Sequence, residues 1–306
     1  MPRPRHLPPA TVAPAVLALL AVLAAPLAAQ QQDFSQVRIK TTPVAGKVYM
    51  LEGAGGNIGV SAGDDGLLIV DDQFAPLADK IKAALEAIHD GELAFVLNTH
   101  WHGDHTGGNP VFGLEALIVA HDNVRVRLST EQTVRGNKVP PLAPEGLPVI
   151  TFGEAMTIHF NGEGIQLIHA PAGHTDGDSL IYFPTSNVLH MGDHFFNGRF
   201  PFVDLASGGT VQGMAKNVAM ALEAFPADVK IIPGHGALGT RADLESFHRM
   251  LEHSLQTVKA GIDAGKSLEE LQQAGLDPEY EDWGSGFIPA SFWIQTVYES
   301  LQQKKP

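Results

Sequence analysis

The sequence contains no cysteine among its 306 residues. This absence excludes disulfide bonds, thiolate nucleophiles, thiolate metal ligands and lipid attachment through cysteine. Positive charge is also scarce, because 20 Lys and Arg face 34 Asp and Glu and leave a formal net charge of -14. Proteins that bind nucleic acid need a cationic face for the phosphate backbone, so this balance argues against such a partner. The hydrophobic content of 44% predicts a large buried core.

Long hydrophobic runs are missing as well, since a bilayer-spanning helix needs about 20 apolar residues. Residues 1–29 instead carry Arg3 and Arg5, a short apolar run over 12–23 and a small-residue end at 26–29. This order is typical of a cleavable signal peptide. A membrane anchor is the alternative, but Pro14 and Pro26 interrupt the run. We expect cleavage after residue 28 or 29, a periplasmic or secreted protein, and no membrane span after processing.

The remaining chain alternates short β-rich runs with amphipathic segments. Apolar positions at Leu77, Ile81 and Leu85 have helical spacing and predict a helix over 77–89. We expect further helices near 122–128, 211–225, 241–261 and 289–302. We expect strands at 47–51, 58–61, 67–70, 95–97, 117–120, 156–160, 166–170, 179–183, 188–191 and 230–232. Four prolines in 136–148 predict a rigid surface connection. Two strand-rich halves, each followed by helices, predict an α/β fold of face-to-face sheets in a single domain over 30–306.

The most informative motif is His-x-His-x-Asp-His, which follows the strand expected at 95–97. It consists of His100, His102, Asp104 and His105. With 14 His in the chain, such a pattern arises by chance in about two sequences per thousand. Alternate residues near a strand end point the same way, so the first two histidines can bind one ion and the next turn can supply a second. Imidazole with carboxylate suits zinc, with iron and manganese as poorer alternatives.

Three later positions also follow expected strands or precede them in tight turns. His174 precedes the strand at 179–183, Asp193 follows 188–191, and His235 follows 230–232. A single histidine after a strand is structural more often than not. Together, however, they lie where α/β proteins usually place their sites, which predicts that they join the histidine motif.

These motifs resemble those of the metallo-β-lactamase superfamily over residues 40–240. The resemblance implies a four-layer αββα sandwich with two zinc ions per chain at one edge of the sheets. It implies a first metal held by His100, His102 and His174, a second held by Asp104, His105 and His235, and Asp193 as the bridge. Asp71 would either support the site from behind or cap a turn.

Four other histidines match no ligand position of the family, and we interpret them as packing or supporting residues: His121, His169, His190 and His194. Trp101 is interpreted as a packing residue. The glycine-rich turn at 53–57 lies where the family often has a mobile flap.

The resemblance implies a metal-dependent hydrolase in which a metal-bridging hydroxide attacks an acyl carbon. Our first hypothesis is a β-lactam as the small-molecule substrate, with Asp104 orienting the hydroxide, Asn197 supporting an oxyanion and Arg199 holding a substrate carboxylate. Lactone, ester or thioester hydrolysis is the alternative, because a bridging Asp193 is more typical of those branches. A di-iron redox protein and a non-catalytic metal-binding protein remain open, as does the oligomeric state.

Overall fold

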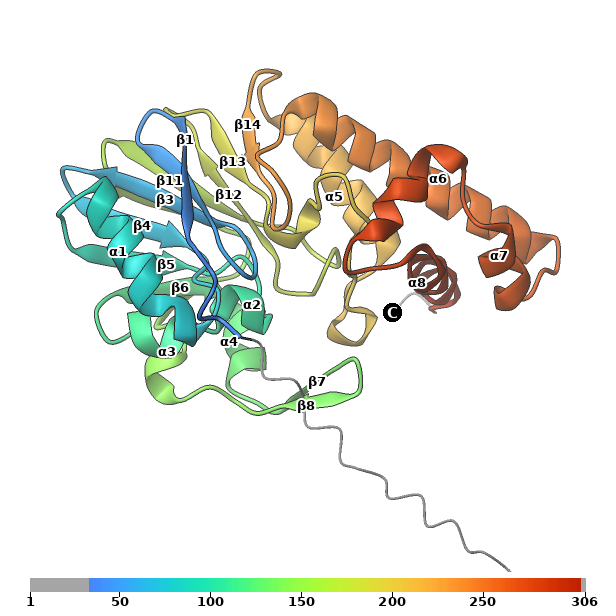
Figure 1. Ribbon diagram of the computed structural model, residues 1–306, viewed down its shortest axis with the longest axis horizontal. Helices are drawn as coiled ribbons and strands as arrows, with labels where there is room; N and C mark the ends of the chain where they lie inside the picture. Colours follow the sequence, from blue (N-terminus) through green and yellow to red (C-terminus); the bar gives the residue numbers. More distant parts are fainter. Residues whose placement is uncertain (1–32, 304–306) are drawn as a thin grey trace, which may run out of the picture. The chain divides into compact units, whose positions relative to one another are not determined.

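Two β-sheets pack face to face in the computed structural model, which describes residues 33–303 (Figure 1). The first sheet has seven strands in the order β1-β2-β3-β4-β5-β6-β9: Lys40–Ala45, Val48–Glu52, Ile58–Gly63, Gly66–Val70, Leu93–Leu97, Leu117–His121 and Ile150–Phe152. The second has five, β10 to β14 in sequence order: Ala155–Phe160, Glu163–His169, Ser179–Phe183, Val188–His190 and Lys230–Ile232. A separate hairpin pairs β7 (Gln132–Val134) with β8 (Asn137–Val139). The expected signal peptide lies outside the described residues.

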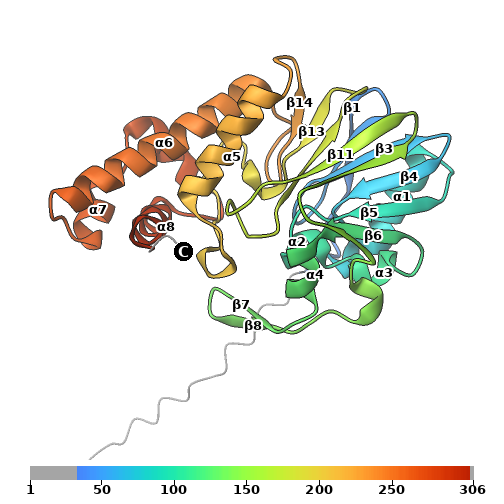
Figure 2. The same ribbon diagram turned by 180° about the vertical axis from the view of Figure 1, so that it is seen from behind.

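Helices cover the outer faces of both sheets, which gives the four-layer αββα order (Figure 2). The α-helices are α1 (Ala78–Ile88), α2 (Gly103–Thr106), α3 (Asn109–Phe112), α4 (Asp122–Leu128), α5 (Val211–Ala224), α6 (Arg241–Asp263), α7 (Leu268–Ala274) and α8 (Ala290–Gln302). The 3-10 turns are η1 (Ala75–Leu77), η2 (Pro144–Gly146), η3 (Gly192–His194), η4 (Leu205–Ser207) and η5 (Pro278–Ser285). Helix α1 packs on the first sheet, and α5, α6 and α8 pack beside the second.

The core between the sheets explains why the central strands are apolar throughout. Leu68 and Leu97 of the first sheet pack in one cluster with Leu167 and Ile181 of the second. Strand β4 is buried at all five positions, because the second sheet covers one face and α1 the other. Burial of such side chains stabilises the fold by about 1.5–3 kcal/mol each.

Most of the expected elements are present within one to three residues of their predicted ends. The segment 136–148, predicted as a rigid surface connection, is mostly exposed and contains two short elements that were not predicted, β8 and η2. The sequence also gave no signal for β1, an edge strand that is largely exposed and contains Pro43. Exposed edge strands lack the alternation on which strand prediction depends.

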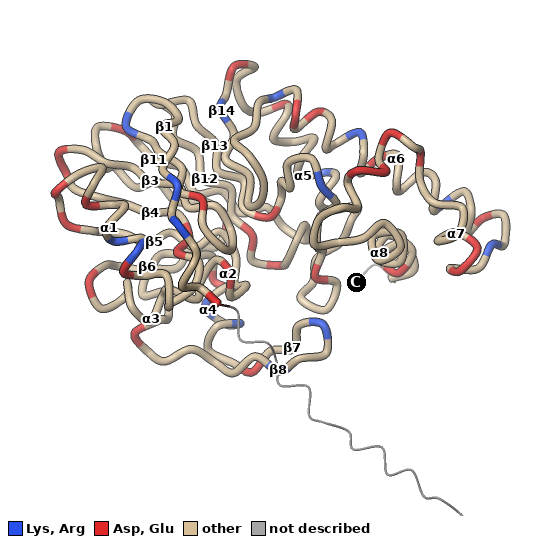
Figure 3. The backbone as a smooth tube through the Cα atoms, viewed as in Figure 1, with Lys and Arg blue, Asp and Glu red and all other residues tan. Residues whose placement is uncertain are grey.

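Charged residues are spread over the described chain. Figure 3 shows Asp and Glu on turns and helices of both flanks, with Lys and Arg interspersed among them. Within residues 33–303 we find no helix with the length and hydropathy that a bilayer crossing requires.

The strand directions determine where polar residues gather. Strand β4 runs parallel to β5, and β13 runs parallel to β14. Strand β11 is two antiparallel steps from β13 and therefore runs in the same direction. The segments that follow these five strands meet at one edge of the sandwich, and the predicted site residues lie in them.

Candidate metal centre

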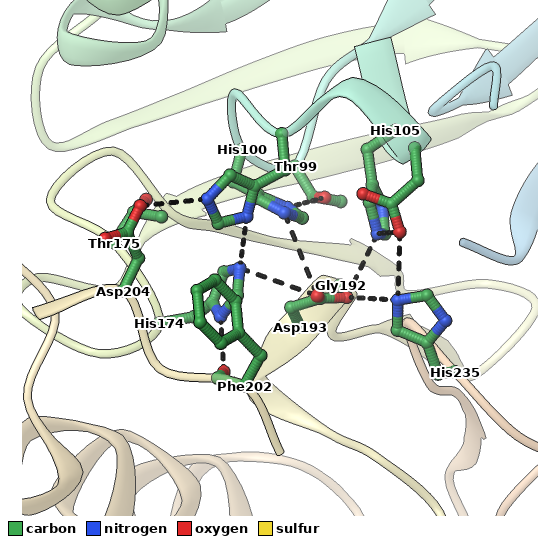
Figure 4. A network of polar contacts seen from close by, with 12 residues as sticks. Thr99, His100, His105, His174, Thr175, Gly192, Asp193, Phe202, Asp204 and His235 are labelled. Carbon is green, nitrogen blue, oxygen red and sulfur yellow. Dashed lines mark hydrogen bonds and ion pairs between the residues drawn. The ribbon is translucent and has the colours of Figure 1, made fainter. Parts of the chain in front are cut away.

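All seven predicted ligands come together at this edge (Figure 4). His100 and His102 follow β5, and Asp104 and His105 lie on the short helix α2. The remaining three come from the second sheet: His174 after β11, Asp193 in η3 after β13, and His235 after β14. Three groups of three have ligand atoms within 4.8 Å of one another: His100, His105 and Asp193 form one, and the other two share no residue. We call His100, His102 and His174 the first group, and Asp104, His105 and His235 the second group.

The hydrogen bonds of the first group determine which ring nitrogens carry hydrogen. Nε2 of His102 donates to Oδ2 of Asp204 at 3.0 Å, and Nδ1 of His174 donates to the carbonyl of Phe202 at 2.8 Å. The remaining nitrogens, Nδ1 of His102 and Nε2 of His174, therefore carry lone pairs, and they lie 2.8 Å apart. Two lone pairs at this distance repel each other unless a cation lies beside both.

His100 completes the first group by the same reasoning. The hydroxyl of Thr99 donates to Asp71, so Nδ1 of His100, 3.0 Å from that hydroxyl, must be the donor between the two. Nε2 of His100 is then a lone pair, and it is buried without a hydrogen-bond partner. The three acceptor nitrogens of the first group thus converge as metal ligands do.

Asp193 lies between the two groups. Its Oδ2 is 3.5 Å from Nε2 of His174 and 3.9 Å from Nε2 of His100. Its Oδ1 is 3.1 Å from Nε2 of His105 and 3.4 Å from Nε2 of His235. One carboxylate therefore faces both groups, which is the geometry expected of a bridge.

The second group carries more charge than the first. Burial opposes protonation of His235, but the carboxylates of Asp193 and Asp104 raise its pKa to about 9. Burial also opposes ionisation of Asp104, yet the facing His105 and His235 lower its pKa to about 2. In the first group, burial lowers the pKa of His174 to about 4. Carboxylates thus hold protons on the second group, where bound cations would take their place.

The residues present fit a metal ion. Nε2 of His100, Nε2 of His105 and Oδ1 of Asp193 are buried without hydrogen-bond partners, although an unpaired buried polar atom is costly. Imidazole and carboxylate, with no thiolate, form a donor set suited to zinc.

Asp71 supports the site from behind. Its carboxylate is fully buried and accepts hydrogen bonds from the backbone nitrogen and hydroxyl of Thr99 and from Nδ1 of His105, each at 2.7 Å. Of the two roles open for Asp71, the structure thus favours support of the ligands over capping of a turn. Metal-binding histidines commonly donate their second nitrogen in this way.

The glycine-rich turn at 53–57 is tied to the site by several hydrogen bonds. The amide of Gly56 donates to the carbonyl of Asp104, and Asn57 donates to the carbonyls of Pro233 and Gly236. A Cβ at Gly56 would overlap the ring of His105. The turn therefore packs as a wall against the second group; mobility of this turn stays a prediction.

The other predicted residues lie near the centre with different contacts. The side-chain amide of Asn197 donates to the carbonyl of Ala237 at 3.0 Å, and its backbone nitrogen donates to the backbone carbonyl of His235. Arg199 packs beside Gly286. Trp101 is buried against Val124 and Leu128, which confirms its interpretation as a packing residue. Catalytic roles for Asn197 and Arg199 stay predictions.

The four histidines interpreted as packing or supporting residues lie outside the ligand groups of the described residues. The rings of His121 and His169 stack with centroids 3.8 Å apart. His190 lies 3.0 Å from the carbonyl of Asn57, and His194 contacts Asn217. These contacts confirm the interpretation of packing and support.

Sequence reasoning missed Phe202 and Asp204, which hold two histidines of the first group. The available signal was weak: a single Asp in the apolar run 200–205, followed three residues later by Ser207. That spacing is typical of an Asp that accepts hydrogen bonds in a local turn.

Comparison with known proteins identifies the family. The model of the metallo-beta-lactamase superfamily matches residues 51–235. The chain therefore belongs to the metallo-β-lactamase superfamily, whose members are metal-dependent hydrolases, and the expected enzyme class is confirmed.

Curated relatives have different activities. The chain is 22% identical to the metallo-beta-lactamase type 2 of Bacteroides fragilis over 65% of this chain and 77% of the relative. It is 25% identical to the linear primary-alkylsulfatase of Pseudomonas sp. over 78% of this chain and 53% of the relative. A hydroxyacylglutathione hydrolase of Synechococcus sp. is 35% identical over 42% of this chain and 44% of the relative. The chain thus spans only about half the length of the last two.

Solved structures confirm the fold. A metallo-beta-lactamase from Pontibacter korlensis superposes with a TM-score of 0.59 at 15% identity, over 70% of this chain and 99% of that protein. A stereoselective inverting sec-alkylsulfatase from Pseudomonas sp. superposes with a TM-score of 0.64 at 16% identity, over 85% of this chain and 50% of that protein. The predicted αββα sandwich is therefore correct.

Proposed function

We propose that this protein is a dinuclear zinc hydrolase that cleaves an acyl bond in a small-molecule substrate. The observation that carries the proposal is the position of Asp193, whose two oxygens face the first and second groups separately. Two metal positions sharing one carboxylate are suited to hydrolysis without a nucleophilic side chain.

A zinc pair, when bound, supplies a nucleophilic water at neutral pH and polarises the substrate carbonyl. The chain contributes the setting. Asp193 would lower the net charge at both positions, and Asp104 would lower it further at the second, so a cation held by the three histidines of the first group would keep the higher positive charge. Asp104, one third exposed, faces solvent and can accept a hydrogen bond from an attacking water. Phe196, buried in the core, stacks on His235 and helps to hold that ring in place.

Two substrate classes have specific support. A β-lactam is favoured by the similarity to the Bacteroides fragilis lactamase, which extends over most of both chains. A lactone, ester or thioester is favoured by Asp193, because the resemblance associates a bridging aspartate with those hydrolases. The alkylsulfatase relative adds sulfate esters as a third class to be tested.

Turnover of a substrate panel tests the proposal. The purified protein with added zinc is assayed with nitrocefin, a carbapenem, a lactone, a thioester and an alkyl sulfate, each with and without a chelator. Chelator-sensitive turnover near 10⁴ M⁻¹s⁻¹ or above for one class identifies the substrate. His102→Ala is expected to abolish this activity. If the zinc-loaded protein hydrolyses none of these substrates, or only the alkyl sulfate, the proposed cleavage of an acyl bond is wrong.

Metal analysis distinguishes the di-iron alternative from the zinc pair. We expect two zinc ions per chain in protein purified without added metal. Two irons with a visible absorption band would contradict the proposal and support redox chemistry.

We also propose that the protein acts outside the cytoplasm, as the basic and apolar order of residues 1–29 indicates. Intact-mass measurement of protein from an exported fraction is expected to show an amino terminus at residue 29 or 30. Retention of residue 1 in that fraction would contradict processing.

A further inference from the structure

A single loop orients two of the three histidines in the first group. Phe202 and Asp204 lie on the segment between η3 and α5, about ten residues after Asp193. The carbonyl of Phe202 accepts a hydrogen bond from Nδ1 of His174, and the carboxylate of Asp204 accepts one from Nε2 of His102. The backbone nitrogen of Asp204 also donates to the carbonyl of His174 at 2.9 Å. The loop is therefore attached to both ligands at once.

Hydrogen bonds from Ser207 fix the position of the Asp204 carboxylate beside His102. Oδ2 accepts the hydroxyl of Ser207 at 2.7 Å, and Oδ1 accepts the backbone nitrogen of Ser207 at 3.2 Å. The side chain of Asp204 is 5% exposed, so water competes little for its oxygens. With two hydrogen bonds already accepted, the carboxylate presents a fixed acceptor to Nε2 of His102.

This acceptor determines the tautomer of His102. A hydrogen on Nε2 leaves the lone pair on Nδ1, which faces His174. The opposite tautomer would place a hydrogen on Nδ1 and remove the lone pair that a cation needs. Carboxylate partners of this kind also make the ring a stronger ligand, and their loss typically costs 10–100-fold in metal affinity.

We propose that Asp204 is a positioning residue that fixes the metal-binding tautomer of His102 and thereby sets the zinc affinity of the first group. The inference rests on the proposed function, because it requires that the first group binds zinc. It assigns to the loop after Asp193, which follows the second sheet, a role in orienting a ligand that follows the first sheet.

The test compares Asp204→Asn and Asp204→Ala with Glu163→Gln. Glu163 is a matched control: it is a buried carboxylate whose hydrogen bonds come from the hydroxyl and backbone nitrogen of Ser186 and the backbone nitrogen of Thr185, not from a histidine. Each variant is made in a His235→Ala background, where the second group has lost a ligand. Zinc affinity is measured by competition with a chromophoric chelator.

We expect zinc binding to weaken 10–100-fold in both Asp204 variants and to stay within about threefold in Glu163→Gln. Long-range ¹H–¹⁵N spectra of the zinc-loaded proteins add a direct readout, since they show which nitrogen of His102 carries hydrogen. Asp204→Ala is expected to lose the protected Nε2 hydrogen of His102 but to keep the Nδ1 hydrogen of His174, which Phe202 of the same loop accepts. Loss of both hydrogens would instead indicate an unstable loop. Thermal unfolding of the metal-free variants checks that each is folded.

Unchanged zinc affinity in Asp204→Asn, or an equal loss in Glu163→Gln, would overturn the inference while leaving the proposed function intact. Failure of the unsubstituted protein to bind zinc would instead overturn the proposed function, and the inference with it.

Discussion

The two groups of the centre are supported by different parts of the fold. His105 of the second group is held by Asp71, which directly follows the fully buried strand β4. His102 and His174 of the first group are held by a loop in which Ala206 and Gly208 are exposed. His105 is therefore anchored at the end of a sheet strand, and so is His100 through Thr99, whereas His102 and His174 depend on a loop. This difference teaches that one centre can combine a position fixed by the core with a position that loop changes can adjust.

Asp71→Asn is the largest expected perturbation. The carboxylate accepts three hydrogen bonds in a fully buried place, and the amide can accept only part of them. We expect the free energy of unfolding of the metal-free protein to fall by about 3 kcal/mol. Urea unfolding followed by tryptophan fluorescence measures it.

Asp204→Asn provides the comparison for Asp71→Asn. Asp204 is itself buried, but its loop includes the exposed Ala206 and Gly208 and can relax around the new side chain, so we expect a loss of only about 1 kcal/mol. Equal losses in the two variants would show that loop and sheet support the centre alike, against the distinction drawn above.

Gly56→Ala tests the wall against the second group. A Cβ at this position would overlap the ring of His105, so the ring or the turn must move. Overpacking of this kind costs about 1–3 kcal/mol, and we expect the zinc content to fall from two ions towards one. Gly103→Ala is the matched control, because no atom lies within 4 Å of its Cβ position. A zinc content of two in Gly56→Ala would show that the second group tolerates displacement.

The sequence predicted the ligands better than their supports. The chemistry of His100, His102, Asp104 and His105 is concentrated in one motif, which chance rarely produces. Strand order then placed the later ligands correctly, because parallel strands end at the same edge. Local pattern and strand direction were sufficient for these residues.

Other features depend on contacts that are distant in the sequence. Asp204 lies 102 positions from His102, and nothing in its own segment indicates that partner. Gly56 is a wall only because the turn folds back onto His105. Strand β1 is defined by its pairing with β2, not by an apolar pattern of its own. Such features follow from tertiary packing, which single-sequence patterns do not encode.

Zinc affinity is expected to respond to pH differently in the two groups. The pKa of His235 is raised to about 9 in the metal-free centre, so this ring is protonated at pH 7 and must lose its proton to bind. The pKa of His174 is lowered to about 4, so this ring is already neutral. Burial opposes protonation of His105, but Asp193, Asp104 and Asp71 raise its pKa as well, so we expect the affinity of the second position to rise at least tenfold per pH unit from 6.5 towards 9, while the first changes little. Competition titrations at pH 6.5, 7.5 and 8.5 measure both. If the zinc affinity of both positions did not change with pH, the two groups would not differ in their electrostatics.

The smallest effects on catalysis are expected for substitutions of Asn197 and Arg199, which lie between Asp193 and the loop that holds the first group. Asn197 adjoins His235 of the second group, and Arg199 lies closer in sequence to the loop that holds the first. The side-chain amide of Asn197 is already hydrogen-bonded to Ala237, so we expect Asn197→Ala to lower kcat only about twofold.

Arg199→Ala is expected to raise KM about fivefold for substrates that carry a carboxylate, because a half-exposed ion pair contributes up to about 1 kcal/mol. KM for neutral lactones should not change, since they offer the guanidinium no anion. Steady-state kinetics with a carboxylate-bearing and a neutral substrate separate the two cases. Equal changes for both substrates would assign Arg199 to packing against Gly286 rather than to substrate recognition.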